Sequence, residues 1–379
     1  MSSLYLHIPF CSSKCPYCDF FSQVGSQLQI DEYVELLCLN IKILKQTRPT
    51  TTPLETIFFG GGTPSLLSIK QIENILNNIE QNFGTETAAE ITLEANPGTV
   101  TLEQLQGYRQ AGVNRLSLGI QSLNDQTLQL LGRIHTANQA RESVFAARTA
   151  GFDNLSLDLM FALPKQDLIS LEQEITALLN LEPEHISLYG LSFEEGTDFF
   201  TRLQSGQLSP CADNLYADQY HLLHEQLNVA GFEHYEISNF ARPKRRCRHN
   251  QVYWKRGDCL AIGAGAHSFI NQKWGERWHI PANLRDYKKS LLRGESPAEL
   301  LETYNQLGAM KEYVYLALRT SDGIDGADFE QKFNLPLQQA FPEALNKATD
   351  YLHSSLATGR YSFNLNGWLI YDHLISHFL

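Results

Sequence analysis

Basic residues are the scarce class in this chain, with 30 Lys and Arg against 42 Asp and Glu and a net charge of −12. This deficit argues against broad contact with the phosphate backbone of a nucleic acid. No apolar run approaches the ~20 residues that span a bilayer. Residues 1–15 (MSSLYLHIPFCSSKC) lack the basic and long apolar regions of a secretion signal. We therefore expect a cytoplasmic protein with reduced thiols, no nucleic-acid partner and no transmembrane segment.

The first half of the chain alternates short β-like runs with helical patterns. A length of 379 residues allows two or three domains. The predicted strands are residues 4–8, 56–59, 90–94, 115–121, 154–160 and 185–191, and the predicted helices are residues 31–46, 69–82, 101–112, 137–150 and 168–180. Strands that alternate with helices predict parallel β-α units and an α/β fold class. About six such units make a barrel or an open doubly wound sheet.

Each predicted strand has one apolar and one polar face, because side chains alternate with period two. In the fourth strand, Leu116, Leu118 and Ile120 share one face, whereas Ser117 and Gln121 lie on the other. The apolar face is expected to meet the helices. A closed eight-stranded barrel fills its interior with bulky aliphatic side chains. A polar inner face instead predicts a wider, incomplete barrel that holds a polar ligand.

The β-α rhythm stops after about residue 200. A helix is predicted over 214–230, followed by a segment rich in glycine, aromatic and basic residues that we interpret as an irregular connector. Helices are predicted again over 304–318, 326–333 and 341–353, then a strand pair around a turn at 364–367 and a last helix over 371–379. The predicted division is a core at 1–235, a connector at 236–300 and a C-terminal domain at 301–379.

Cys11, Cys15 and Cys18 form a C-x3-C-x2-C motif directly after the first predicted strand. Three thiolates on one tight loop can hold an iron–sulfur cubane and leave its fourth iron open, and soft sulfur ligands select iron–sulfur clusters or zinc. A structural zinc site would need a fourth ligand, for which His7 is the near candidate. The remaining cysteines, at positions 38, 211, 247 and 259, are scattered and are interpreted as ordinary residues.

A second motif, Gly60-Gly61-Gly62-Thr63-Pro64, follows the second predicted strand. Glycines let the backbone approach a ligand closely, and their amides can point at an anion. The Lys-Ser/Thr pair of a phosphate loop does not follow. A plain tight turn is the alternative interpretation.

Together with Tyr17 in the aromatic position before the last cysteine, these motifs resemble the radical S-adenosylmethionine (SAM) superfamily. More narrowly, YLHIPFCSSKCPYC, GGGTPS, LEANPG, LGIQSL, LGRIH and LDLMFALP are similar to the oxygen-independent coproporphyrinogen III oxidase family, and within it to the HemW haem chaperone branch. The resemblance covers nearly the whole chain. It implies an incomplete (β/α)6 radical SAM barrel with a mostly helical, HemN-like C-terminal domain, a [4Fe-4S] cluster and bound SAM.

The resemblance also implies roles for single residues. Cys11, Cys15 and Cys18 match the cluster ligands. The positions that match SAM contacts are Tyr5, Tyr17, Gly61, Gly62, Thr63, Glu94, Gln121, Arg133 and Asp158. Several of these fall on the polar strand faces or at the carboxyl ends of strands, where β-α barrels place their active sites. Glu94 can accept hydrogen bonds from ribose hydroxyls, and Arg133 is a fitting partner for a carboxylate.

The string His249-Asn250-Gln251-Val252-Tyr253-Trp254 resembles a hallmark of the HemW branch. An imidazole can be an axial haem ligand, and neighbouring aromatic rings offer a flat apolar surface. Haem is therefore expected as cargo, bound by His249, Tyr253 and Trp254. A basic run just upstream can hold the haem propionates, and its members are Arg242, Lys244, Arg245, Arg246 and Arg248. A solvated basic loop with a structural histidine is the alternative.

Two departures from the oxidase separate the branches. The oxidase carries a further cysteine two residues after the third cluster ligand, where this chain has Phe20. The oxidase also has an extension before its first strand. We therefore predict a haem chaperone that transfers haem to acceptor haemoproteins, respiratory ones among them, and that can form a homodimer. The alternatives are oxidative decarboxylation of coproporphyrinogen III and, against the charge balance, a nucleic-acid binder. No catalytic residue is predicted, and cleavage of SAM is left open.

Overall fold

The computed structural model describes residues 2–48, 52–355 and 359–379. Its strands are β1 (Ser2–Ile8), β2 (Phe10–Cys11), β3 (Gln23–Val24), β4 (Leu54–Gly61), β5 (Thr85–Ala95), β6 (Arg115–Gln121), β7 (Leu155–Phe161), β8 (His185–Gly190), β9 (Glu233–Glu236), β10 (Asn239–Ala241), β11 (Asp258–Ile262), β12 (His267–Ile270), β13 (Glu276–His279), β14 (Glu299–Thr303), β15 (Ile324–Asp325), β16 (Leu352–Ser355) and β17 (Arg360–Phe363). Its α-helices are α1 (Gln27–Thr47), α2 (Ile69–Phe83), α3 (Leu102–Gln110), α4 (Asp125–Leu130), α5 (Ala137–Thr149), α6 (Leu168–Leu179), α7 (Asp198–Gln204), α8 (Asp213–Val229), α9 (Arg248–Trp254), α10 (Leu284–Leu292), α11 (Gln306–Ala317), α12 (Gly326–Phe333), α13 (Leu337–Ala340), α14 (Pro342–Lys347), α15 (Leu365–Leu369) and α16 (Tyr371–Ile375).

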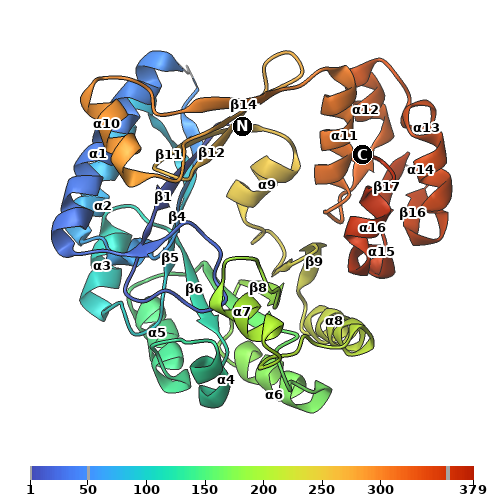
Figure 1. Ribbon diagram of the computed structural model, residues 1–379, viewed down its shortest axis with the longest axis horizontal. Helices are drawn as coiled ribbons and strands as arrows, with labels where there is room; N and C mark the ends of the chain where they lie inside the picture. The colour runs from blue at the N-terminus through green and yellow to red at the C-terminus, as the bar shows by residue number, and fades with distance from the viewer. Residues whose placement is uncertain (1, 49–51, 356–358) are drawn as a thin grey trace.

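The six predicted strands form the centre of one large sheet. β1, β4, β5, β6, β7 and β8 pair in parallel and in chain order. The helices α1, α2, α3, α5 and α6 lie along the outside of the curved sheet (Figure 1). The predicted (β/α)6 arrangement is confirmed, and the predicted strand at 115–121 coincides with β6.

Helices of the barrel begin at capping boxes. In each box, the side chain of the N-cap residue accepts a hydrogen bond from the backbone amide three residues later, and the side chain of that later residue accepts one from the N-cap amide. The caps of α1, α2, α3 and α5 are the pairs Ser26–Gln29, Ser68–Gln71, Thr101–Gln104 and Thr136–Gln139. Each box fixes where the chain turns from a strand end into a helix. The loops that carry the candidate site residues are held between these fixed points.

The predicted division between the strand faces is also confirmed. Leu116, Leu118 and Ile120 are fully buried toward the helices. On the inner face, the Ser117 hydroxyl donates to an Asp158 carboxylate oxygen at 3.2 Å. The barrel interior is therefore polar, as an incomplete barrel with a polar ligand requires.

The interpretation of 236–300 as an irregular connector is wrong. β11 pairs in parallel with β1, and β12, β13 and β14 extend that edge of the sheet as antiparallel strands. Two glycines of this segment, Gly263 and Gly265, lie in the turn between β11 and β12. Gly263 has φ +95°, and a Cβ there would lie 2.5 Å from the His7 carbonyl oxygen. Only glycine fits so close to another backbone.

The C-terminal region contains a three-stranded sheet in the order β15-β17-β16, and α11 contacts α12 through the rings of Tyr313 and Phe329, whose centroids lie 5.7 Å apart. The helices predicted at 304–318 and 326–333 are confirmed, but the strand pair predicted around 364–367 is misplaced. β16 and β17 pair earlier in the chain, and Asn364 caps α15 by accepting a hydrogen bond from the Gly367 amide at 2.9 Å. Asparagine favours turns and helix N-caps alike, so this signal is ambiguous in sequence.

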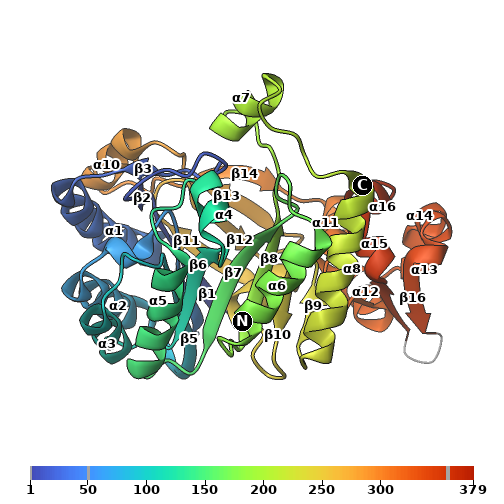
Figure 2. The same cartoon turned by 90° about the horizontal axis from the view of Figure 1, so that it is seen from below.

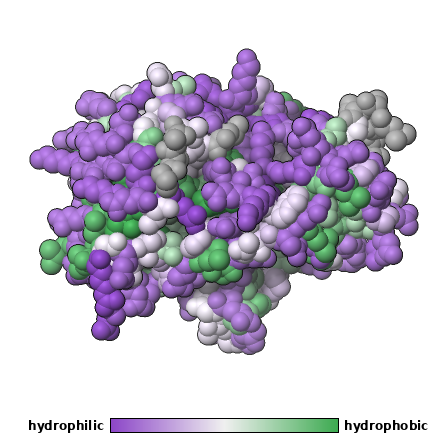
Figure 3. Space-filling model, turned by 90° about the horizontal axis from the view of Figure 1, so that it is seen from above, coloured by the Kyte–Doolittle hydropathy of each residue, from purple (hydrophilic) through white to green (hydrophobic). Residues whose placement is uncertain are grey.

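Within the described residues, we find no helix with the length and apolar character needed to cross a bilayer. The face shown in Figure 3 is mostly hydrophilic, with small separate apolar areas. The division of the chain at residues 235 and 300 stays a prediction.

Candidate functional site

The three-cysteine motif lies on a loop at the carboxyl end of β1. The loop is closed by β2 and β3, which pair in parallel, and the Cys18 amide donates to the Cys15 carbonyl at 3.1 Å. His7 holds the returning segment, since its Nε2 lies 2.9 Å from the Phe21 carbonyl oxygen. Cys11, Cys15 and Cys18 are all free and half-buried. Figure 2 shows β2 and β3 at the same end of the barrel as α4 and α7.

The donor set fits a cubane cluster better than zinc. His7 is not free to be a fourth zinc ligand, because its Nδ1 is also taken, 3.1 Å from the Tyr5 hydroxyl. Within residues 2–48, 52–355 and 359–379, no three or more His, Cys, Asp or Glu side chains converge on one ion position. Zinc needs four such converging ligands, whereas each iron of a cubane takes one thiolate and leaves the thiolates well apart.

The glycine motif joins the end of β4 to the cysteine loop. The Gly62 amide donates to the Ile8 carbonyl at 2.8 Å, the Thr63 amide to the Phe10 carbonyl at 2.7 Å, and the Gly61 amide to a Glu94 carboxylate oxygen at 3.2 Å. In this structure the three amides are therefore engaged by acceptors of the protein itself, and contact of Gly61, Gly62 and Thr63 with SAM stays a prediction. The turn positions the loop on which the cysteines lie.

We predict that Gly62→Ala lowers the cluster content of the protein severalfold. An added Cβ would lie 2.6 Å from the Phe10 carbonyl oxygen and 2.9 Å from the Cys11 sulfur, so one of them must move. Iron and sulfide per chain, after anaerobic reconstitution, are the measurement. Gly308→Ala, in α11, is the control. Normal iron content in Gly62→Ala would show that the loop tolerates the shift.

One cavity of about 480 Å³ connects the cysteine loop with the inner face of the barrel. The three cysteines line it, as do the predicted SAM-binding residues Tyr17, Gly61, Gly62, Thr63, Glu94, Gln121, Arg133 and Asp158. Tyr5 lies outside this lining, and its ring stacks on Phe58 with centroids 6.1 Å apart. Sequence reasoning missed Asn96 and Tyr189, which also line the cavity. In the predicted strand 185–191, Tyr189 lies two residues from Ser187 and so on the polar face, and Asn96 lies two residues after Glu94.

Arg133 joins three parts of the site. Its guanidinium donates to the Asn96 side-chain oxygen at 2.5 Å, to the Gly119 carbonyl at 2.7 Å and to the Cys15 sulfur at 3.4 Å. Its Nε is buried and has no partner. A buried donor without an acceptor costs free energy, so this atom indicates a missing ligand with an acceptor group.

Two carboxyl groups, Glu94 and Asp158, share the cavity. Burial and the nearby charge of Asp158 raise the pKa of Glu94 to about 8, against the opposing effects of the Gly61 amide and Arg115. Burial also raises the pKa of Asp158, although hydrogen bonds from Ser187 and the Arg115 charge oppose this. At neutral pH the Glu94 carboxyl is therefore mostly protonated until a cationic ligand arrives.

The H-N-x-x-Y-W string lies in α9, which sits inside the curve of the sheet (Figure 1) and contacts Thr56 of β4 and Glu90 of β5 through His249. His249 is 1% exposed. Its Nδ1 lies 2.8 Å from the Thr56 hydroxyl, and its Nε2 lies 2.9 Å from the Tyr253 hydroxyl. Burial and the Arg115 charge lower its pKa to about 3. Haem ligation by His249 stays a prediction, and it requires a conformation in which one of these hydrogen bonds is broken.

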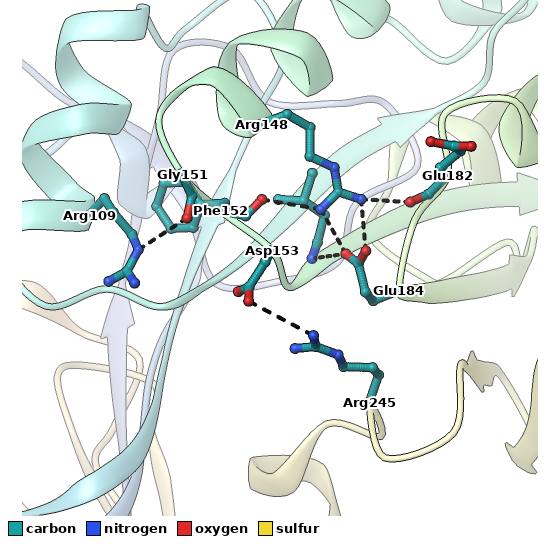
Figure 4. A network of polar contacts seen from close by, with 9 residues as sticks. Arg109, Arg148, Gly151, Phe152, Asp153, Glu182, Glu184 and Arg245 are labelled. Atoms are coloured by element: carbon teal, nitrogen blue, oxygen red, sulfur yellow. Dashed lines mark hydrogen bonds and ion pairs between the residues drawn. The ribbon is translucent and has the colours of Figure 1, made fainter.

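Two members of the basic run before α9, Arg245 and Arg246, lie beside carboxylates of the protein itself. Arg246 pairs with Glu233 and with Asp322, both at 3.0 Å, and so joins β9 to the turn that follows α11. Arg245 lies 3.9 Å from Asp153 (Figure 4). In the same view, the guanidinium of Arg148 pairs with the Glu184 carboxylate at 2.9 Å. In this conformation Arg246 pairs with two carboxylates of the protein itself, and binding of the haem propionates by the run stays a prediction.

Comparison with known proteins agrees with this site. The model of the radical SAM superfamily matches residues 5–178, and that of the HemN C-terminal domain matches residues 292–370. A protein named "Heme chaperone HemW" from Lactococcus lactis is 34% identical over 91% of this chain and 89% of its own length. The protein of the same name from Synechocystis is 38% identical over 86% and 80%. A mitochondrial radical SAM domain-containing protein 1 of Bos taurus is 36% identical over 87% and 76%.

The solved coproporphyrinogen III oxidase (HemN) of Escherichia coli shares the fold, with a TM-score of 0.84 at 23% identity over 100% of this chain and 89% of that one. The superfamily implies a [4Fe-4S] cluster and SAM as cofactors, and the free thiols, the cavity and the unpartnered Arg133 Nε fit them. The chain therefore belongs to the HemW haem chaperone family of the radical SAM superfamily.

Proposed function

We propose that this chain is a haem chaperone, which binds a [4Fe-4S] cluster, SAM and haem and delivers the haem to acceptor haemoproteins. The observation that carries this is the identity of 34% over nine-tenths of the chain to a protein named as a haem chaperone. The cavity supports it, since three half-buried thiols border a polar chamber at the carboxyl edge of the barrel.

We assign the cofactors to residues as follows. Cys11, Cys15 and Cys18 hold the cluster. The Arg133 Nε donates to the SAM carboxylate, and Glu94 accepts from the ribose hydroxyls. When bound, the cluster and SAM supply one-electron chemistry.

The remaining SAM-binding residues position and shield the ligand. Tyr17 and Asp158 line the cavity walls, and Gly61, Gly62 and Thr63 contribute backbone without side-chain bulk on the glycines. Gln121 holds φ +61° at the end of β6, a strained conformation of the kind that accumulates at binding sites.

The oxidase activity is the second candidate, favoured by the shared fold with HemN. Phe20, which stands where the oxidase has its additional cysteine, is 64% exposed and lines the cavity. We expect the anaerobically reconstituted protein, given coproporphyrinogen III, SAM and a reductant, to form no protoporphyrinogen IX. We expect the haem-loaded protein to transfer haem to an apo-b-type haemoprotein, seen as a shift of the Soret band. If the protein decarboxylated coproporphyrinogen III and transferred no haem, the oxidase would replace the chaperone as the proposed function.

SAM affinity is predicted to rise with pH. Below the raised pKa of Glu94, about 8, ligand binding must release a proton, because a cationic ligand favours the carboxylate. Affinity should therefore increase by up to about tenfold per pH unit from pH 6 to pH 8 and then level off. Glu94→Gln should flatten this profile. A wild-type profile without slope, measured by calorimetry in two buffers, would show that Glu94 does not lose its proton when SAM binds.

The raised pKa of Glu94 also predicts how the stability of the unliganded protein changes with pH. The pKa of Glu94 is about 8 in the folded protein and near 4.5 in the unfolded chain, so the protonated carboxyl stabilises the folded state. The free energy of unfolding should then fall as the pH rises from 4.5 toward 8. Glu94→Gln should remove that part of the slope.

We further propose a cytoplasmic location and a homodimer. Seven free cysteines in the described part of the chain support a reducing compartment. An open edge strand supports self-association: all five residues of β14 are exposed, including Leu300 and Leu301 at 50% and 54%. Light scattering of the purified protein gives the oligomeric state directly.

A further inference from the structure

Two histidines face each other on neighbouring strands near the cysteine loop. β12 and β13 pair antiparallel with His267 directly opposite His279, and the two ring centroids lie 5.8 Å apart. His267 is exposed, and the side chain of His279 is 29% exposed. The His279 Nε2 lies 3.5 Å from a Glu299 carboxylate oxygen, which orients that ring.

The pair lies at the same edge of the sheet as the cysteine loop. β11 runs parallel to β1, so the turn after β11 reaches the carboxyl end of β1. A Cβ on Gly265 in that turn would lie 3.0 Å from the Phe21 ring, and Phe21 stacks on His7. His267 follows two residues later, and its charge is one cause of the lowered pKa of His7. The imidazole of His267 is therefore a close neighbour of the candidate cluster loop.

The pair faces the inside of the barrel. Cys259 of β11 lies opposite both Ser3 of β1 and Phe269 of β12. Ser3 in turn lies opposite Thr56, whose hydroxyl contacts His249 in the interior. Residues directly opposite in neighbouring strands share a face, and so do residues two apart in one strand. His267 is two residues from Phe269, so it lies on the inner face.

His267 differs from the deeply buried histidines of the barrel. The ring nitrogens of His185 are engaged by Ser156 and Tyr235 at 2.8 and 2.7 Å, and those of His249 are engaged as described above. His267 is accessible, and partial burial together with His279 and Arg277 lowers its pKa. It therefore presents a neutral imidazole, the form that binds metals, at neutral pH. Phe20, the neighbour of Phe21 on the cysteine loop, has an exposed ring that offers a flat apolar surface.

We propose that His267 is an axial ligand of the bound haem, positioned by His279 and Glu299, and that the porphyrin lies on the inner face of β12 and β13 beside the cysteine loop. This inference rests on the proposed haem-binding function. Ligation needs no redox step, since a lone pair of the neutral imidazole is donated to the haem iron. The site would place the cargo next to the cluster and SAM without opening the buried α9.

The test is a titration of the full, cluster-loaded chain with haemin, followed by Soret absorption. We expect His267→Ala to raise the haem Kd at least about tenfold and to shift the Soret band, and added imidazole to restore the band. His353→Ala, an exposed histidine of β16, is the matched control and should bind as the wild type does. Iron and sulfide per chain should be the same in all variants.

The outcomes separate the two proposals. If the wild-type protein binds no haemin, the haem chaperone proposal fails. If the wild type binds haemin and His267→Ala matches it in Kd and Soret position, the chaperone proposal stands and His267 is excluded. If only His249→Ala loses haem, the ligand is the histidine of α9, and the inference is overturned.

Discussion

Cys15→Ser is expected to reduce cluster iron at least about tenfold after anaerobic reconstitution. A serine oxygen is a harder and more weakly held ligand for iron than a thiolate, and a cubane held by three thiolates has none to spare. Cys15 also accepts a hydrogen bond from Arg133, so its sulfur lies where the loop meets the wall of the cavity. Iron and sulfide analysis and the charge-transfer absorption band are the measurements.

The control for this substitution is Cys211→Ser. Cys211 is also half-buried and free, but it lies outside the cavity, with its thiol 3.6 Å from the Ala212 carbonyl. It should keep full iron content. Equal cluster content in Cys15→Ser and Cys211→Ser would mean that Cys15 is not a ligand.

Arg133→Met is expected to have the second large effect, which is a loss of affinity for SAM. The substitution removes the unpartnered Nε and the hydrogen bonds to Asn96 and Gly119. A charged hydrogen bond contributes about 1.5–3 kcal/mol, so the affinity for SAM should fall roughly 10- to 150-fold. Cluster iron should stay near the wild-type level, because the three cysteines are intact. Calorimetric titration of the loaded protein with SAM gives the affinity.

Arg133→Lys separates charge from geometry. Lysine keeps the positive charge but cannot place several donors in a planar fork. It should recover only a small part of the lost affinity. Arg141→Met, at an exposed position on α5, is the control for loss of a positive charge and should bind SAM normally. SAM affinity within about twofold of wild type in Arg133→Met would remove this residue from the site.

The barrel could be predicted from sequence because its signals are local. The alternation of Leu116 and Leu118 with Ser117 is a period-two pattern within one strand, and the structure keeps it as a buried and a polar face. The cysteine spacing is also local, so the loop and its chemistry could be named before its surroundings. Glu94 and Gln121 could be brought together by the rule that parallel strands end at one edge, and Asp158 by its place on the polar face of its strand.

The hydrogen-bond partners of His249 could not be predicted in the same way. Its partner Thr56 is 193 residues away, and nothing near either residue indicates the contact. The motif was therefore interpreted by its chemistry as a haem site, whereas the structure shows the ring bonded inside the barrel. Haem binding by His249, Tyr253 and Trp254 stays a prediction.

The outer strands were missed for a related reason. β11 and β12 are short, and β11 pairs with β1, which lies far earlier in the chain: Ser3 is opposite Cys259. Glycines and charged residues in such a segment are typical of loops, so local patterns favoured a connector. The same segment carries His267, which becomes noticeable only when the sheet brings it to the cysteine loop.

The most direct test of the central claim is Mössbauer spectroscopy, with iron and sulfide analysis, of anaerobically purified full-length protein before and after addition of SAM. The account predicts about four irons and four sulfides per chain, with one iron site whose spectrum changes when SAM binds. Zinc in place of iron, or a cluster whose irons do not respond to SAM, would contradict it.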